Sequence, residues 1–155
     1  MKNLIGIDAN QSKKIVNELN DLLANYQVFY QNLRGFHWNI KGKSFFELHL
    51  KFEELYNDAV IKIDEIAERV LTLDGTPLHS FESYLKQSEI KSVEGVIDAQ
   101  LSVKTILENF YVLLIKERNI LELASDATDE GTVSLMSDYI TQTEKTMWML
   151  NAYLG

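Results

Sequence analysis

The chain of 155 residues is long enough for one domain with a substantial core, and its 46% hydrophobic and 25% charged residues are ordinary for a folded protein. Its formal net charge of −8 favours cations as partners and opposes contact with nucleic acid or anionic membranes. Because the chain contains no cysteine, disulfides, zinc fingers and thiol catalysis are excluded, and any metal ligand must be nitrogen or oxygen, which suits iron, manganese or zinc.

The first predicted helix covers residues 10–38. Apolar side chains recur there at intervals of three and four residues, from Ile15 through Leu22 to Phe36. The stretch at residues 39–43 breaks this pattern, and we expect a short turn there.

The second predicted helix covers residues 45–73. Ser44 followed by Glu47 is a capping-box signature for its start. Gly75, with Pro77 two residues later, marks its end.

The rest of the chain predicts one short and two long helices. A connection over residues 76–91 contains a short helix at residues 81–86. A third long helix opens at Ser92 and Glu94. The fourth follows an acidic loop at residues 125–130.

These elements predict an all-α fold, since no stretch resembles a strand and one proline and seven glycines leave few helix breakers. Helices of the predicted lengths measure about 35–45 Å, the size of a four-helix bundle. The longer link between the second and third helices leaves room for a crossover that contains the short helix. No segment is apolar enough for a signal peptide or a membrane span, so we expect residues 1–155 to form a single cytoplasmic domain.

Two histidines and three carboxylates are the strongest candidates for chemistry. They are His37 on the first helix and His49, Glu53, Asp64 and Glu68 on the second. Positions 49 and 68 are centred on the same point of the helix as positions 53 and 64. An antiparallel copy of this helix, related by a two-fold axis, would therefore place His49 and Glu53 opposite Asp64 and Glu68. Two imidazoles and three carboxylates that meet across such an interface would suit iron.

The geometry of the second helix supports a site shared between chains. At about 100° per residue, the four candidate residues form a stripe that is separate from the apolar stripe facing the core. Phe46, Val60 and Ile61 lie on the same outward side, as expected for a subunit interface. His49 and Glu68 are about 28 Å apart along a straight helix, too far to bind one ion within one chain.

Each candidate also has a structural explanation when it is taken alone. Asp64 and Glu68 would suit a solvated helix face, and His37 would suit a hydrogen-bonded structural role. Glu53 beside Glu54 is a common surface pair. The joint symmetry of the four positions favours the shared site.

The sequence around these residues resembles the signature of the Dps proteins, or miniferritins. The motif runs without gaps through HWNIKG at residues 37–42, FFELH at 45–49, FEELY at 52–56 and DEIAER at 64–69, and the similarity covers the whole chain. The resemblance implies a ferritin-like bundle whose twelve copies form a hollow shell. It also implies that Fe(II) is oxidised with hydrogen peroxide or oxygen and stored as ferric mineral, with no organic cofactor, which protects the cell from oxidative stress.

The resemblance also implies where the ferroxidase centre lies, at the two-fold interface. Its ligands would be His37, His49 and Glu53 from one subunit and Asp64 and Glu68 from the other. Trp38 would be a neighbouring aromatic residue. Glu53 departs from the aspartate that is frequent at its position, and we expect this to alter the geometry of the site more than its identity.

Acidic residues near the last helix correspond to the lining of three-fold pores in the family. They are Asp126, Asp129 and Glu130, with Asp138 as a weaker candidate. Carboxylates at a helix start are also favoured by capping and by the helix dipole, so the structural explanation stays open.

Three other functions are alternatives to iron oxidation. A DNA-compacting protein associated with the nucleoid is disfavoured, because no lysine-rich run lies at either end and twelve chains at −8 each would oppose phosphate contact. A di-iron protein with metals inside each bundle would need Glu-x-x-His on two helices, which the sequence lacks. A helical interaction module without iron chemistry remains an alternative.

Overall fold

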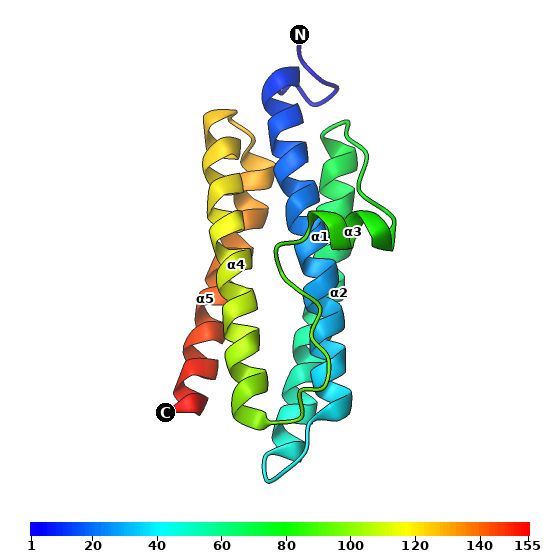
Figure 1. Cartoon of the computed structure of the whole chain (residues 1–155). Coiled ribbons are helices and arrows are strands. Elements are labelled where there is room, and N and C mark those ends of the chain that lie inside the picture. Colours follow the sequence, from blue (N-terminus) through cyan, green and yellow to red (C-terminus); the bar gives the residue numbers. More distant parts are fainter.

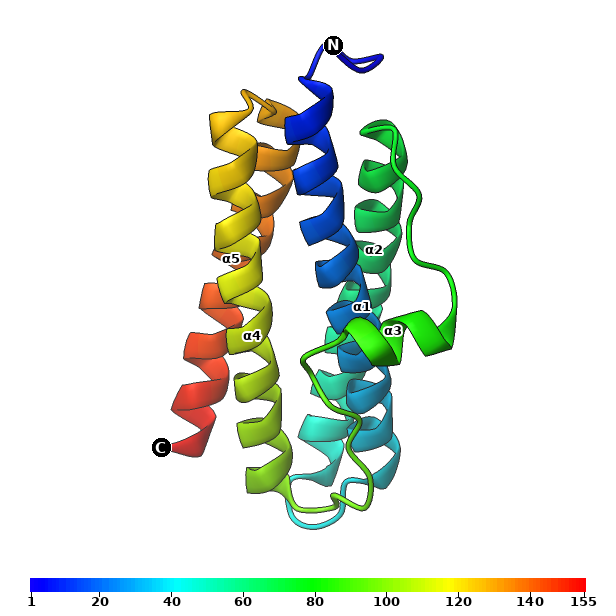
Figure 2. The ribbon, with the colours of Figure 1, turned by 45° about the horizontal axis from the view of Figure 1, so that its top comes forward.

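The computed structural model describes residues 1–155 and contains five helices and no strand. The helices are α1 (Ala9–Asn39), α2 (Phe45–Thr72), α3 (Phe81–Gln87), α4 (Ala99–Asp126) and α5 (Glu130–Leu154). The four long helices lie side by side as a bundle, and short α3 lies across α1 (Figures 1 and 2). The predicted all-α bundle with a short helix in the crossover is confirmed. None of the helices combines the length and the apolar character that a membrane span requires.

The order of the helices explains how the two ends of the bundle are built. A turn at residues 40–44 makes α1 and α2 antiparallel, and residues 73–98 then return along the length of the bundle (Figure 1). As a result α4 runs in the same direction as α2, and α5 returns antiparallel to α4. The end of α1 therefore lies beside the start of α2.

The starts of the long helices are fixed mostly by aspartate side chains. Asp8, Asp98 and Asp129 each accept a hydrogen bond from a backbone N–H in the first turn of the following helix. Ser44 precedes α2 as predicted, but its side chain makes no capping bond. Its hydroxyl instead accepts a hydrogen bond from the Tyr153 hydroxyl at 2.9 Å, so the predicted capping box is wrong.

The prediction that the third long helix opens at Ser92 and Glu94 is also wrong, because α4 begins at Ala99. The buried side chain of Asn32 on α1 bonds the backbone on both sides of residue 92, at 2.9 and 3.0 Å. Gly95 then adopts a φ of +74°, which a helix does not permit. These two features keep the end of the crossover out of helical conformation.

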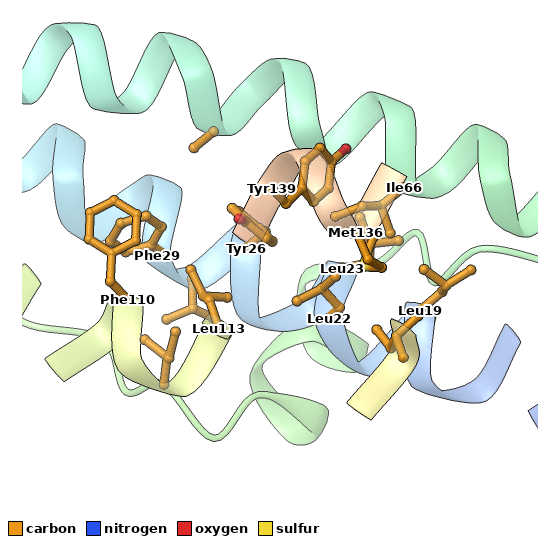
Figure 3. Packing of buried hydrophobic residues seen from close by; sticks show 14 of the residues in the cluster. Leu19, Leu22, Leu23, Tyr26, Phe29, Ile66, Phe110, Leu113, Met136 and Tyr139 are labelled. Atoms are coloured by element: carbon orange, nitrogen blue, oxygen red, sulfur yellow. The ribbon is translucent and has the colours of Figure 1, made fainter. Parts of the chain in front are cut away.

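Apolar side chains from all four long helices meet in the core of the bundle (Figure 3). Phe29 of α1 and Phe110 of α4 pack edge to face with their ring centroids 4.8 Å apart. Full burial of side chains of this size contributes about 1.5–3 kcal/mol each, which holds the helices in register. Polar side chains such as Tyr26 and Tyr139 lie within the same layer (Figure 3).

Candidate metal centre

The turn between α1 and α2 brings His37 and His49 together, as predicted. Their rings are stacked, with centroids 3.7 Å apart and planes within 12° of parallel. His37 Nδ1 lies 2.6 Å from the backbone oxygen of His49, and His49 Nδ1 lies 2.7 Å from the backbone oxygen of His37. Because a carbonyl oxygen only accepts, each Nδ1 carries the proton and donates it. In the neutral form of each ring, Nε2 then keeps the lone pair that a metal-binding imidazole requires.

Neighbouring aromatic side chains fix the orientation of the histidine pair. Phe45 stacks on the His49 ring with the centroids 4.9 Å apart. Tyr56 meets the His37 ring edge to face at 5.3 Å. His37 is buried and His49 is half-buried, so both rings are held by packing as well as by hydrogen bonds.

The three candidate carboxylates lie along α2 at increasing distance from the histidines. Glu53 is one turn beyond His49 and half-buried, whereas Asp64 and Glu68 are exposed farther along the helix. None of the three takes part in an ion pair. A single chain brings together no group of three or more histidine or acidic side chains that could hold a metal ion. The candidate ligands of one chain therefore form no complete metal site by themselves.

Large apolar side chains are exposed on the same helix. Phe46 is 85% exposed, Ile61 60% and Val60 42%. Apolar side chains in this setting, beside carboxylates without partners, are typical of a surface that another protein chain covers.

The geometry agrees with what this chain is similar to. A family model described as "Ferritin-like domain" matches residues 16–155. The crystal structure of a Dps protein from Vibrio cholerae O1, described as a member of a broad superfamily of ferritin-like diiron-carboxylate proteins, is 58% identical with a TM-score of 0.98. The match covers 99% of this chain and 97% of that chain. The chain belongs to the Dps family.

Other relatives of this Dps family member extend across bacteria. A protein from Porphyromonas gingivalis named "DNA protection during starvation protein" is 45% identical over 148 residues, which cover 96% of this chain and 93% of the relative. The crystal structure of Dps from Staphylococcus aureus is 36% identical with a TM-score of 0.89, and the match covers 92% of this chain and 96% of that one. The resemblance to Dps proteins and the ferritin-like fold predicted from the sequence are thus confirmed.

Trp38, the aromatic residue that the Dps resemblance singled out, is 57% exposed. The guanidinium of Arg34 lies over its ring, 4.8 Å from the centroid, and also lies 5.4 Å from the ring centroid of Tyr30. These cation–π contacts hold the exposed indole against Arg34 on the surface of α1.

The acidic residues predicted to line a pore in the Dps shell separate into two groups. Asp126, Glu130 and Asp138 are exposed. Asp129 is only 1% exposed, caps α5 and accepts a hydrogen bond from the Arg69 guanidinium at 2.6 Å. The Asp129 carboxylate is thus buried, with one oxygen bonded to Arg69 and to the backbone of α5 within the chain, and its part in a pore stays a prediction. The predicted acidic loop is also shorter than expected, since only residues 127–129 separate α4 from α5.

The sequence prediction missed a group of polar residues at the centre of the bundle. They are Tyr26, Lys62, Glu117, Tyr139 and Thr143, all buried. The signal was present in the sequence, because Glu117 falls at a core position of α4, between Leu113 and Ile120 at helical spacing. A carboxylate at such a position must find partners inside the fold.

Proposed function

We propose that this member of the Dps family oxidises Fe(II) at a centre shared between two chains and stores the ferric product inside a hollow shell of twelve chains. The observation that carries the proposal is the reciprocal hydrogen bonding of His37 and His49, which engages both Nδ1 atoms and leaves both Nε2 atoms available to a metal ion, with Glu53 one turn farther along α2. Asp64 and Glu68, exposed and without ion-pair partners, would complete the centre from a second chain. The symmetric spacing of these positions on α2 supports the arrangement.

The donor set of this centre suits iron as a substrate. Neutral imidazoles and carboxylates bind ferrous iron, and the harder carboxylate oxygens favour the ferric state, which makes bound iron easier to oxidise. Two ferrous ions supply one electron each to hydrogen peroxide, which also takes up two protons and leaves as two water molecules. Because both electrons are delivered together, no hydroxyl radical is released, and this would protect the cell from oxidative stress.

Cation entry in the proposed shell would use exposed carboxylates near the start of α5. Asp126, Glu130 and Asp138 supply such groups. Asp129 would serve the entry indirectly, since its bond to Arg69 fixes the start of α5 against α2.

The proposal includes no direct contact with DNA in the cytoplasm. A charge of −8 per chain opposes the binding of phosphate groups, and a shell of many chains would add to that repulsion. A gel-shift measurement at low salt should therefore show no retarded DNA band. A retarded band would contradict this part of the proposal.

Stopped-flow measurement of Fe(II) oxidation, with hydrogen peroxide and oxygen in turn, tests the centre. Glu53→Gln keeps the shape of the side chain but removes a ligand charge, and we expect the initial rate to fall at least about tenfold. Glu54→Gln is the matched control, because Glu54 is an exposed neighbour that pairs with Lys51 at 2.6 Å. An unchanged rate in Glu53→Gln would refute the assignment of this ligand.

A further inference from the structure

A cluster of polar residues at the centre of the bundle is separate from the candidate metal centre. It takes Tyr26 from α1, Lys62 from α2, Glu117 from α4, and Tyr139 and Thr143 from α5, and every one of these is 5% exposed or less. The Tyr26 hydroxyl donates a hydrogen bond to Glu117 Oε1 at 2.7 Å. Figure 3 shows Tyr26 and Tyr139 surrounded by apolar side chains between the helices. All four long helices thus contribute polar groups to one internal place.

Three atoms of this cluster have no hydrogen-bond partner in the protein. They are Glu117 Oε2, the Tyr139 hydroxyl and the Thr143 hydroxyl. Tyr139 and Thr143 are one turn apart on α5 and therefore share a face of that helix. A buried polar atom without a partner costs about 1–3 kcal/mol, so such groups are normally paired with protein or with ordered water. Their concentration here indicates a small polar ligand.

A groove between α2 and α5 leads from the surface to this cluster. Its volume is about 460 Å³, and apolar side chains such as Leu55 and Phe110 line part of it. At its polar part lie Asp58, Lys62 and Thr143, and the last of these carries one of the unpartnered atoms. A water molecule occupies about 30 Å³ in the liquid, so several can enter along this route.

The charges around the cluster favour water over a metal ion. The Lys62 ammonium pairs with Asp58 at 2.5 Å and faces the Tyr139 ring at 5.3 Å from its centroid. A buried ammonium at this position would repel a second cation. Water can instead donate to Glu117 Oε2 and can either donate to or accept from a hydroxyl, so it suits the chemistry of all three atoms.

We propose that each chain holds a hydrated proton-accepting site inside its bundle, in which water entering between α2 and α5 bridges Glu117, Tyr139 and Thr143. The Glu117 carboxylate takes up a proton that is passed from the solvent along this water, which leaves a carboxylic acid and unchanged water molecules. All residues of this site belong to one chain. The proposal does not depend on the proposed iron chemistry.

The electrostatic surroundings of Glu117 agree with proton uptake. Burial raises the pKa of Glu117 to about 7, although the hydrogen bond from Tyr26 and the charges of Lys62 and Arg118 lower it and Asp58 raises it. Burial also raises the pKa of Tyr139, and the carboxylates that face it from α2, α4 and α5 add to this effect. Tyr139 therefore stays protonated as a hydrogen-bond donor, and Glu117 is the group that titrates.

Infrared titration of the assembled protein, in H₂O and in D₂O, tests the site. We expect a carboxylic acid C=O band that disappears with a midpoint near pH 7 and shifts promptly after transfer to D₂O. Glu117→Gln should remove this band, whereas Glu122→Gln, which changes an exposed carboxyl on the same helix, should retain it. The absence of the band in the unaltered protein, or a band that stays unshifted after prolonged exposure to D₂O, would overturn the proposal.

Two further measurements keep the test decisive if Glu117→Gln does not fold. Tyr26→Phe removes the hydrogen bond that favours the carboxylate, so the midpoint of the band should move to higher pH. A high-resolution crystal structure should show water within hydrogen-bond distance of Glu117 Oε2. An unmoved midpoint, a dry cavity, or anomalous density for a metal ion at this place would each contradict a hydrated proton-accepting site.

Discussion

The candidate metal centre and the internal polar cluster differ in where their polar side chains come from. The histidine pair lies at the junction of two helices, and one chain brings together no group of three or more histidine or acidic side chains that could hold a metal ion. The internal cluster draws on all four long helices and is enclosed by one chain. Polar residues that face the core must therefore be satisfied within one chain, whereas those on the outer face of α2 would, in the proposed function, find their partners on a second chain.

The two regions also differ in how completely their own atoms are bonded. Both Nδ1 atoms of the histidine pair are satisfied by backbone oxygens, so the orientation of both rings is fixed within one chain. The internal cluster leaves three atoms without partners in the protein. This difference in bonding is the basis for proposing metal ions at the first region and water at the second.

The largest effect that separates the two regions should come from Ile61→Asp. Ile61 is 60% exposed on the outer face of α2, and a charge there would be buried without a partner in the proposed interface. We expect the shell to dissociate and rapid Fe(II) oxidation to be lost, while the internal cluster keeps its infrared band. Analytical ultracentrifugation measures the assembly, with Leu4→Asp in the exposed N-terminal segment as the control. An intact, active shell of Ile61→Asp would contradict the claim that the outer face of α2 forms the interface that completes the iron centre.

Glu117→Gln should alter the pH dependence of stability. The pKa of Glu117 is raised from 4.5 to about 7, so the folded chain keeps a proton that the unfolded chain loses as the pH rises between these values. The free energy of unfolding of the unaltered protein therefore falls over this window and not above it. Glutamine does not titrate, so the variant should gain up to about 3 kcal/mol relative to the unaltered protein between the two ends of the window. Denaturant titrations at several pH values measure this gain, and parallel curves for the two proteins would contradict it.

The smallest predicted effect concerns the contact between α2 and the start of α5. A Cβ at Gly131 would lie within 2.7–2.9 Å of the Arg69 guanidinium, which donates to Asp129 and Thr132. Gly131→Ala should displace Arg69, leave the buried Asp129 carboxylate unpaired and lower stability by about 1–3 kcal/mol. Gly35→Ala meets no atom within 4 Å inside a helix, and it should raise stability by about 0.5–1 kcal/mol. Equal shifts in denaturation midpoint for the two alanine variants would show that the contacts of Arg69 with Asp129 and Thr132 do not stabilise the protein to this extent.

The sequence was sufficient wherever one local pattern decided the structure. Apolar spacing located the cores of the long helices, and the short turn after α1 placed His37 next to His49. Prediction from the sequence failed where side chains distant in the sequence determine the backbone conformation or pair with a predicted site residue. Asn32 on α1 holds the crossover near residue 92 out of helical conformation, and Arg69 on α2 pairs with Asp129, and neither partner is visible from local sequence. The motif that resembles Dps proteins supplied the assignment of ligands that no single chain brings together.

The central claim is that each iron centre combines halves from two chains, and subunit mixing tests it most directly. His49→Ala damages one half and Glu68→Gln the other, so each variant alone should be inactive in Fe(II) oxidation. If the two are co-assembled in equal amounts, half of the two-fold pairs are mixed and one of the two centres in each mixed pair is intact, which predicts about a quarter of the unaltered activity. His49→Ala mixed with Glu53→Gln is the control that should recover nothing, because both changes lie in the same half. A mixture of His49→Ala and Glu68→Gln that stays as inactive as its components would contradict the shared centre.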